Sequence, residues 1–238
     1  MAEHDHKAER RRAKSAAARK QAKHADRRRR TIRIGAIVLG IAALIVGLTV
    51  AVVTADYGQA ENTGAKQIPS QPARTAVGRE TAPPWDAPDH PVAHVAAAGL
   101  PMLGAEGTVE HIHAKLNVIV NGNPVAVPAE IGIDQASQRL SPLHTHDTTG
   151  VIHVESPVPA TFTLGQFMTE WDVSLDAQHI GNLTATNGNA LHWYVNGQEQ
   201  TGDPAAHELK AHDVITIVYG PTDQHVDVPS TYDWPADL

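Results

Sequence analysis

Residues 110–122 read EHIHAKLNVIVNG, and apolar residues occupy every second position from Ile112 to Val120. This alternation is typical of a β-strand with one face buried. Asn121-Gly122 follows at once and is typical of a two-residue hairpin turn, so we expect a returning strand over 125–127. The apolar face of the first strand would carry Ile112, Ala114, Leu116, Val118 and Val120, and the polar face His111, His113, Lys115 and Asn117.

A second histidine-bearing stretch, LHTHDTTGVIHVES, spans residues 143–156. Its second half alternates in the same way, which predicts a strand over 151–155 with Ile152 and Val154 toward the core. His153 and Glu155 would then lie on the opposite face, as do the histidines of the first strand. Residues 129–143 carry no such pattern and are expected to form a loop.

The clearest helix signal follows at residues 163–171. Thr163 and Gln166 match a capping box, and Phe162 and Phe167 are placed as a hydrophobic staple. The apolar residues then recur at helical spacing up to Trp171, which predicts one helix over 164–171 that packs on a sheet. Two further strands are expected over 190–195 and 214–219. The predicted fold class is α+β, with a mixed sheet of about five strands and one packed helix.

The order of these elements resembles that of a β-grasp (ubiquitin-like) domain over residues 110–220. The segments HWYVNG (192–197) and ELKAHDVITIVYG (208–220) are similar to the closing strands of such modules. The loop with His144 and His146 is an addition to the simple pattern. The LHTHD and GVIHVES run also resembles one in uncharacterised membrane-anchored extracytoplasmic proteins of bacteria, a resemblance that implies no activity.

The charge of the chain is unevenly distributed. Residues 1–33 hold thirteen Lys/Arg and four Asp/Glu, although the whole chain has a formal net charge of −7. Residues 34–55, IGAIVLGIAALIVGLTVAVVTA, carry no charge, and as a helix they would extend about 33 Å, enough to cross a hydrocarbon core of about 30 Å. We therefore expect a single transmembrane helix in the plasma membrane, with the N-terminus cytoplasmic and the C-terminal domain extracytoplasmic.

The remaining domain boundaries follow from composition. Residues 1–33 are expected to form a basic cytoplasmic tail that contacts anionic lipid headgroups. The sequence indicates nucleic-acid binding by this tail only weakly, so we do not expect a nucleic-acid partner. Residues 56–90 contain five prolines and are expected to form a linker. Residues 91–221 would form the histidine-rich extracytoplasmic domain, and residues 222–238 an acidic C-terminal tail.

The two H-x-H pairs and the single histidine near them suggest a metal site. In a strand, H-x-H places both rings on one face, where they can reach a single ion. The chain has no cysteine and three methionines, which argues against a soft Cu(I) site; imidazole with carboxylate suits Zn²⁺, Cu²⁺, Ni²⁺ or Fe²⁺. We expect a divalent transition metal, Zn or Cu(II) foremost. The candidate ligands are His144, His146, His153, His113 and His111.

Three functions fit this pattern. The first is a membrane-tethered domain that binds a metal in order to handle or sense it, alone or with a membrane protein partner. The second is a metalloenzyme with a three-histidine site, in which Glu155 or Asp147 would be the general base. The third is a structural or interaction subunit of a membrane complex, in which the histidines and Asp147 form a polar network or respond to pH without metal. Ser141, His144 and Asp147 lack the G-x-S-x-G motif of a serine hydrolase, so whether the chain is an enzyme stays open.

Overall fold

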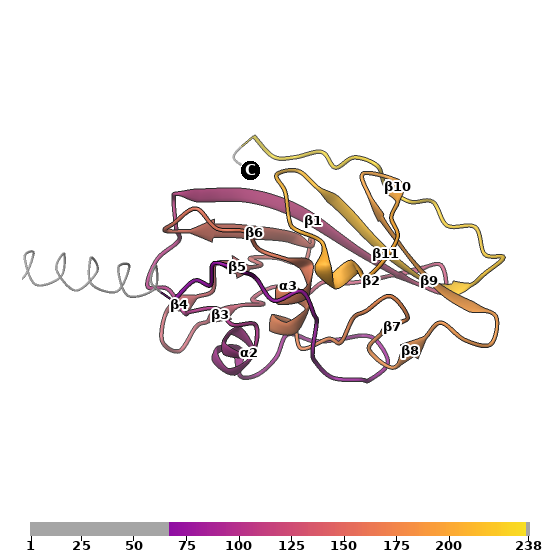
Figure 1. The fold of residues 1–238 in the computed structure, drawn as a ribbon, viewed down its shortest axis with the longest axis horizontal. Helices are drawn as coiled ribbons and strands as arrows, with labels where there is room; N and C mark the ends of the chain where they lie inside the picture. Colours follow the sequence, from indigo (N-terminus) through magenta and orange to yellow (C-terminus); the bar gives the residue numbers. More distant parts are fainter. Residues whose placement is uncertain (1–66, 237–238) are drawn as a thin grey trace, which may run out of the picture. The chain divides into compact units, whose positions relative to one another are not determined.

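The computed structural model describes residues 67–236 and contains a seven-stranded mixed sheet with the order β10-β9-β11-β1-β6-β5, to which β2 adds by pairing with β1 (Figure 1). The predicted transmembrane segment and the basic tail lie outside the described residues. No helix within residues 67–236 is long and apolar enough to span a bilayer. The strands of this sheet are β1 (Glu110–Val120), β2 (Asn123–Val125), β5 (Leu143–His144), β6 (Val151–Ser156), β9 (Asn189–Val195), β10 (Gln198–Glu199) and β11 (Val214–Pro221).

Strand β1 is the centre of the sheet. It runs parallel to β11, with Lys115 opposite Val214, and antiparallel to β6 along its first half and to β2 along its second. Asn121 and Gly122 both have positive φ, 50° and 76°, as a tight hairpin turn requires. The predicted hairpin is therefore confirmed, but its returning strand is Asn123–Val125 and not 125–127, because the two-residue turn brings the chain back at once.

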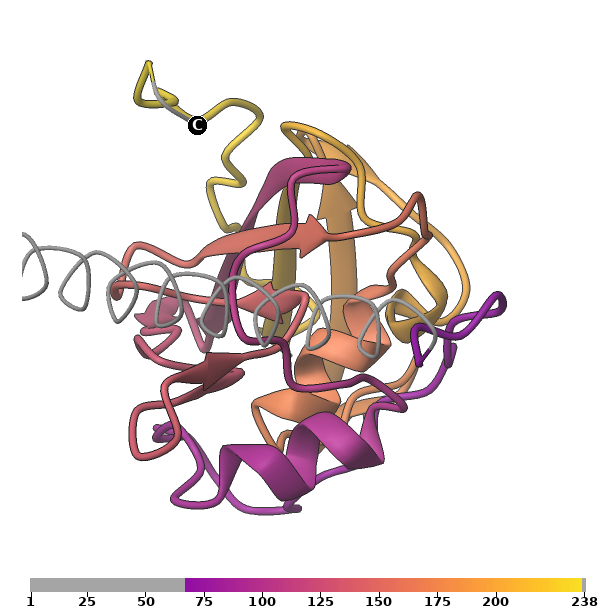
Figure 2. The same cartoon turned by 90° about the vertical axis from the view of Figure 1, so that its left-hand side faces the viewer.

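One face of the sheet forms the core. Leu116 and Val118 of β1 are each 1% exposed, as the alternation predicted. Helix α3 (Leu164–Glu170) lies across this face, and helix α2 (Pro91–Ala97) packs against α3 (Figure 2). Two strand pairs and a short helix complete the described chain: β3 (Ile133–Asp134) with β4 (Arg139–Leu140), β7 (His179–Ile180) with β8 (Leu183–Thr184), and the 3-10 helix η1 (Pro204–Ala206).

The N-terminus of α3 has the predicted capping box. The Thr163 side chain accepts a hydrogen bond from the Gln166 amide, and the Gln166 side chain accepts one from the Thr163 amide. Phe162 and Phe167 are both buried, as a hydrophobic staple requires. The helix thus begins where the sequence predicted, and its C-cap is Trp171.

The prediction of about five strands and one helix was too simple. Residues 129–143, expected to be a loop, include the two-residue strands β3 and β4 and the start of β5. Strands of two residues contain too little sequence for an alternating pattern to appear. Helix α2 has seven residues, of which only Val95 is buried, so it lacks the apolar stripe by which helices are predicted.

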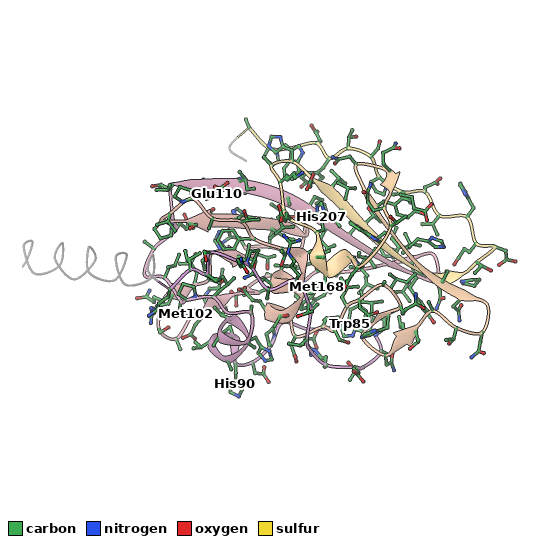
Figure 3. All side chains as sticks on the ribbon, viewed as in Figure 1. Trp85, His90, Met102, Glu110, Met168 and His207 are labelled. Atoms are coloured by element: carbon green, nitrogen blue, oxygen red, sulfur yellow. The ribbon has the colours of Figure 1, made fainter. Side chains whose placement is uncertain are left out.

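Residues 67–90, predicted to belong to a linker, contact the folded domain. Trp85 is 2% exposed (Figure 3), and its ring packs edge-on against Trp171 with the ring centroids 5.9 Å apart. The Trp171 indole also donates a hydrogen bond to the Trp85 carbonyl at 3.1 Å. The hydrophobic core therefore includes chain that precedes Pro91.

The described part of the C-terminal tail, residues 222–236, runs along the side of the sheet opposite the helices (Figures 1 and 2). The Trp234 ring stacks on His212 with a centroid separation of 4.7 Å. The Lys115 ammonium lies 5.4 Å from the centre of the Tyr232 ring. These contacts cover part of the polar face of β1.

Candidate metal centre

The sheet register aligns three of the predicted ligands in a row across three strands. His113 on β1 lies opposite His153 on β6, and His153 lies opposite His144 on β5. All three side chains project from the face of the sheet that points away from the core. Their ring centroids are 4.6 Å apart for His113 and His153 and 5.2 Å apart for His153 and His144.

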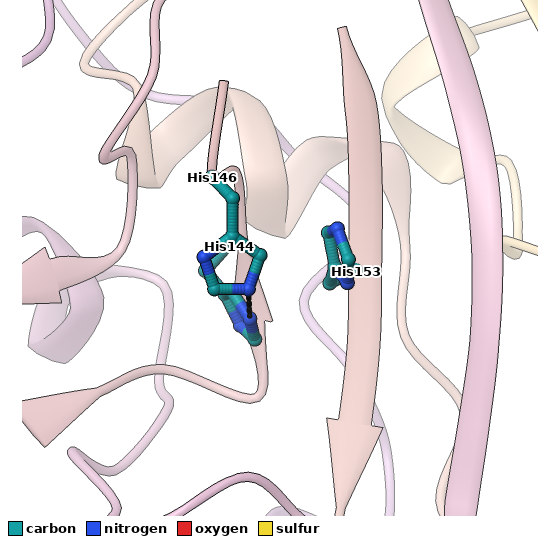
Figure 4. Close-up of side chains that lie close together, drawn as sticks. All are labelled: His144, His146 and His153. Carbon is teal, nitrogen blue, oxygen red and sulfur yellow. Dashed lines mark hydrogen bonds between the residues drawn. The ribbon is translucent and has the colours of Figure 1, made fainter. Parts of the chain in front are cut away.

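The two remaining histidines extend this row at its ends. His111 lies two residues before His113, and the two rings meet edge-on with their centroids 5.1 Å apart. His146 follows β5 and turns back over the row, so its ring centroid lies 4.5 Å from His153 and 4.8 Å from His144 (Figure 4). The structure therefore brings all five predicted ligands into one continuous cluster.

His144 and His146 present nitrogens to each other. Their Nε2 atoms are 3.2 Å apart (Figure 4), and His144 Nδ1 lies 3.0 Å from the Ser141 carbonyl oxygen. A carbonyl only accepts, so Nδ1 of His144 carries the proton and Nε2 of the neutral ring is free to bind a metal. Two nitrogens bound to the same tetrahedral zinc ion at 2.0–2.1 Å would be about 3.3 Å apart. The observed separation is close to that value, and in the absence of an ion the two nitrogens form the hydrogen bond drawn in Figure 4.

Glu155 lies at the centre of the cluster and is 3% exposed. Its Oε1 accepts a hydrogen bond from His153 Nδ1 at 3.1 Å, which leaves the Nε2 of His153 free as a ligand. The same Oε1 lies 3.6 Å from His111 Nε2 and 3.9 Å from His113 Nε2, and Oε2 lies 3.9 Å from His144 Nε2. These three separations are too long for hydrogen bonds.

Two polar atoms of the cluster are buried without a hydrogen-bond partner among residues 67–236: His113 Nε2 and Glu155 Oε2. A buried polar atom that lacks a partner costs about 1–3 kcal/mol. Protein interiors rarely contain such atoms, and bound metal would give each of them a partner.

Burial sets the protonation states of the cluster. Desolvation, together with the neighbouring His153 and His111, lowers the pKa of His113 to about 4. Desolvation also lowers the pKa of His144 to about 4, against the attraction of Glu155. For Glu155, desolvation would raise the pKa, but the hydrogen bond from His153 and the nearby imidazoles outweigh it and lower the pKa. At neutral pH these imidazoles are neutral and this carboxylate is charged, which are the forms that bind metal.

One further acidic residue was not predicted from the sequence. Glu106 precedes β1, and its Oε1 lies 3.6 Å from His146 Nε2. It could join His144 and Glu155 in holding an ion. No sequence signal identifies it, because it lies in irregular chain and precedes the first histidine of β1 by five residues.

Asp147, one of the two residues considered as a general base, is engaged in a turn. Its carboxylate accepts hydrogen bonds from the Thr149 amide at 2.8 Å and from the Thr149 hydroxyl at 2.5 Å, so it stabilises the turn before β6. Ser141 is also occupied elsewhere, since its hydroxyl donates to the buried Glu170 at 2.6 Å. The structure therefore gives no support to a triad of Ser141, His144 and Asp147.

Within the described residues, three groups of side chains could each hold a metal ion, because their ligand atoms lie within 4.8 Å of one another. The groups are His144 with His146 and His153; His111 with His113 and Glu155; and Glu106 with His144 and Glu155. The chain thus contains buried histidine and glutamate clusters with the composition of a metal site. Comparisons with protein-family models, with curated proteins and with solved structures find no match for this chain.

Proposed function

We propose that this chain is a membrane-anchored protein whose extracytoplasmic domain binds a divalent transition metal through the histidine cluster, for metal handling or sensing. The observation that carries this proposal is the convergence of His144, His146 and His153, whose ligand atoms lie within 4.8 Å of one another. His144 is fully buried, and its Nδ1 proton is held by the Ser141 carbonyl. A backbone hydrogen bond that orients a ring in this way is usual for histidine ligands of metals.

The ligand atoms favour Zn²⁺ or Cu²⁺. Imidazole nitrogens suit these ions, as they also suit Ni²⁺ and Fe²⁺, a carboxylate can complete their coordination, and no thiolate is present in the chain. His146 is 44% exposed at its side chain, so an ion bound there would be reachable from solvent. Access of this kind suits a domain that accepts a metal and passes it to a membrane protein partner.

The proposed location depends on the sequence. The uncharged stretch 34–55 would anchor the chain in the bilayer, and the basic residues before it would hold the N-terminus in the cytoplasm next to anionic headgroups. The histidine cluster would then face the extracytoplasmic space. The resemblance to uncharacterised membrane-anchored bacterial proteins agrees with this arrangement.

The sheet order supports the proposed β-grasp relationship. Part of the sheet has the order β2, β1, β11, β9, β10. The long strands β1 and β11 lie side by side and parallel at its centre, and α3 lies between them in sequence. Strands β5 and β6 extend this arrangement on the other side of β1 along its first half. The proposed metal ligands lie on this extension and on the part of β1 that pairs with it.

Thermal unfolding of the full chain in detergent, carrying a histidine-free affinity tag, tests the proposal. A metal that binds only the folded state at about 100 times its Kd should stabilise it by about 2.7 kcal/mol. The double variant His144→Ala/His146→Ala should lose this gain. The matched control His192→Ala/His225→Ala removes two exposed histidines and should retain it. If neither Zn²⁺ nor Cu²⁺ shifts the transition of the unmodified chain, the proposal fails.

A further inference from the structure

The cluster offers more ligands than a single tetrahedral ion can use. It contains five imidazoles and Glu155, with Glu106 at its edge, whereas zinc in proteins almost always takes four ligands. The ligands also separate into two groups that share no histidine: His144 with His146 and His153, and His111 with His113 and Glu155.

The sheet register keeps the outer members of these groups apart. His111 lies opposite Glu155, two residue pairs along β1 from the row of His113, His153 and His144. His146 follows His144 along the chain, and its ring turns back to within 4.5 Å of the His153 ring. Each residue of a strand adds about 3.3 Å and each neighbouring strand about 4.8 Å, so His111 on β1 and His144 on β5 lie at diagonally opposite corners of the cluster. One ion at either corner leaves the other corner without a metal.

Glu155 lies between the two groups, with Oε2 toward His144 and Oε1 toward His111 and His113, while Oε1 also accepts the hydrogen bond from His153 Nδ1. Its Oε1 lies 3.6 Å from His111 Nε2 and 3.9 Å from His113 Nε2, and its Oε2 lies 3.9 Å from His144 Nε2. The two buried atoms without partners follow the same division, since His113 Nε2 belongs to one side and Glu155 Oε2 faces the other. A single ion near His144 would satisfy the carboxylate oxygen and leave His113 without a partner.

From this division we infer that the cluster binds two divalent ions, bridged by the carboxylate of Glu155. One ion would take His144, His146, His153 and Oε2; the other would take His111, His113 and Oε1. This inference rests on the proposed metal-binding function and adds to it a stoichiometry and a bridging ligand. Paired metal ions in proteins are commonly about 3.5–4 Å apart, a distance that a shared carboxylate can span.

Two divalent ions would bring four positive charges to a site with one bridging carboxylate and Glu106 nearby. The imidazoles are neutral ligands, so positive charge would remain on the solvent side of the site. His111 and His146 are 46% and 44% exposed at their side chains, which leaves that side open. The paired ions would therefore take hydroxide or another small anion as a further ligand.

The test counts zinc by mass spectrometry in the full chain, purified in detergent with a histidine-free tag, loaded with Zn²⁺ and dialysed. The unmodified chain should retain two ions, and His144→Ala/His146→Ala and His111→Ala/His113→Ala should each retain one. The control His192→Ala/His225→Ala should retain two. Circular dichroism melts of each variant establish that it is folded before its zinc is counted.

Each alternative result has a definite meaning. One ion in the unmodified chain, lost in the His144/His146 variant, would overturn the paired site and leave the proposed function in place. No ion at all would overturn both. Two ions that both remain in the His111/His113 variant would place the second ion elsewhere and overturn the inference.

Electron paramagnetic resonance of the Cu²⁺-loaded chain tests the bridge itself. Two Cu²⁺ ions joined by Glu155 should couple, so their signal should integrate to less than two independent spins per chain. Glu155→Gln weakens the bridging ligand, and we expect it to lower the number of bound ions or restore uncoupled spins. A full signal from two uncoupled ions in the unmodified chain would contradict the bridge.

Discussion

Acid should destabilise the metal-free protein between pH 6.5 and pH 4, because His113 and His144 must remain neutral in the folded state. Burial lowers the pKa of each to about 4, from 6.5 in the unfolded chain. Between these values the unfolded chain binds protons that the folded protein does not, so the free energy of unfolding falls as the pH falls. The stabilisation is complete above pH 6.5 and is lost as the pH approaches 4.

The size of this effect follows from the pKa shift. One pKa unit corresponds to about 1.36 kcal/mol, so each histidine accounts for roughly 3 kcal/mol over the whole interval. Together the two rings contribute a slope of about 2.7 kcal/mol per pH unit. The buried Glu170 contributes a slope of the opposite sign, because desolvation raises its pKa well above the ordinary value. A comparison of two variants that share Glu170 cancels that contribution.

Urea denaturation in EDTA from pH 4.5 to 7.5 measures the slope. His144→Asn keeps a side-chain amide that can donate to the Ser141 carbonyl, and it should reduce the slope by about 1.4 kcal/mol per pH unit relative to the unmodified chain. The control His225→Asn changes a side chain that is 93% exposed, and it should leave the slope unchanged. Equal slopes for His144→Asn and the unmodified chain would refute the reasoning, since they would show that His144 titrates alike in both states.

Three further predictions concern the core, the buried carboxyl and the location. Leu116→Ala should lower the free energy of unfolding by about 2–5 kcal/mol, as core truncations do, because Leu116 is 1% exposed; a value near zero would mean that the faces of β1 are reversed. The free energy of unfolding of Glu170→Gln, minus that of the unmodified chain, should rise with pH by about 1.4 kcal/mol per pH unit between 4.5 and the raised pKa of Glu170. A difference that does not change with pH would contradict a buried, protonated carboxyl. A reporter fused after Leu238 should be active only outside the cytoplasm, and activity inside would contradict the proposed topology.

Much of the cluster could be predicted from alternation alone. The pattern in 110–120 and 151–155 places His111, His113, His153 and Glu155 on one face, and the structure agrees. Which residues lie opposite one another could not be predicted, because a slip of the strands by two residues keeps every face unchanged. The alignment of His113 with His153 therefore required the structure.

The residues that sequence reasoning missed have local physical explanations. Glu106 lies in irregular chain, where no periodicity indicates the direction of a side chain. Asp147 was considered as a general base although a short carboxylate commonly bonds the backbone two residues on, as it does here with Thr149. Trp85 follows two prolines, whose presence predicted a linker, although an exposed tryptophan in a linker would have been unusual.

Anomalous X-ray scattering from crystals of the protein grown with Zn²⁺ tests the central claim most directly. The account predicts a zinc peak about 2.0–2.1 Å from the Nε2 atoms of both His144 and His146, with Glu155 also in contact. Peaks confined to exposed histidines such as His192 and His225, or the absence of any zinc peak at the cluster, would contradict it.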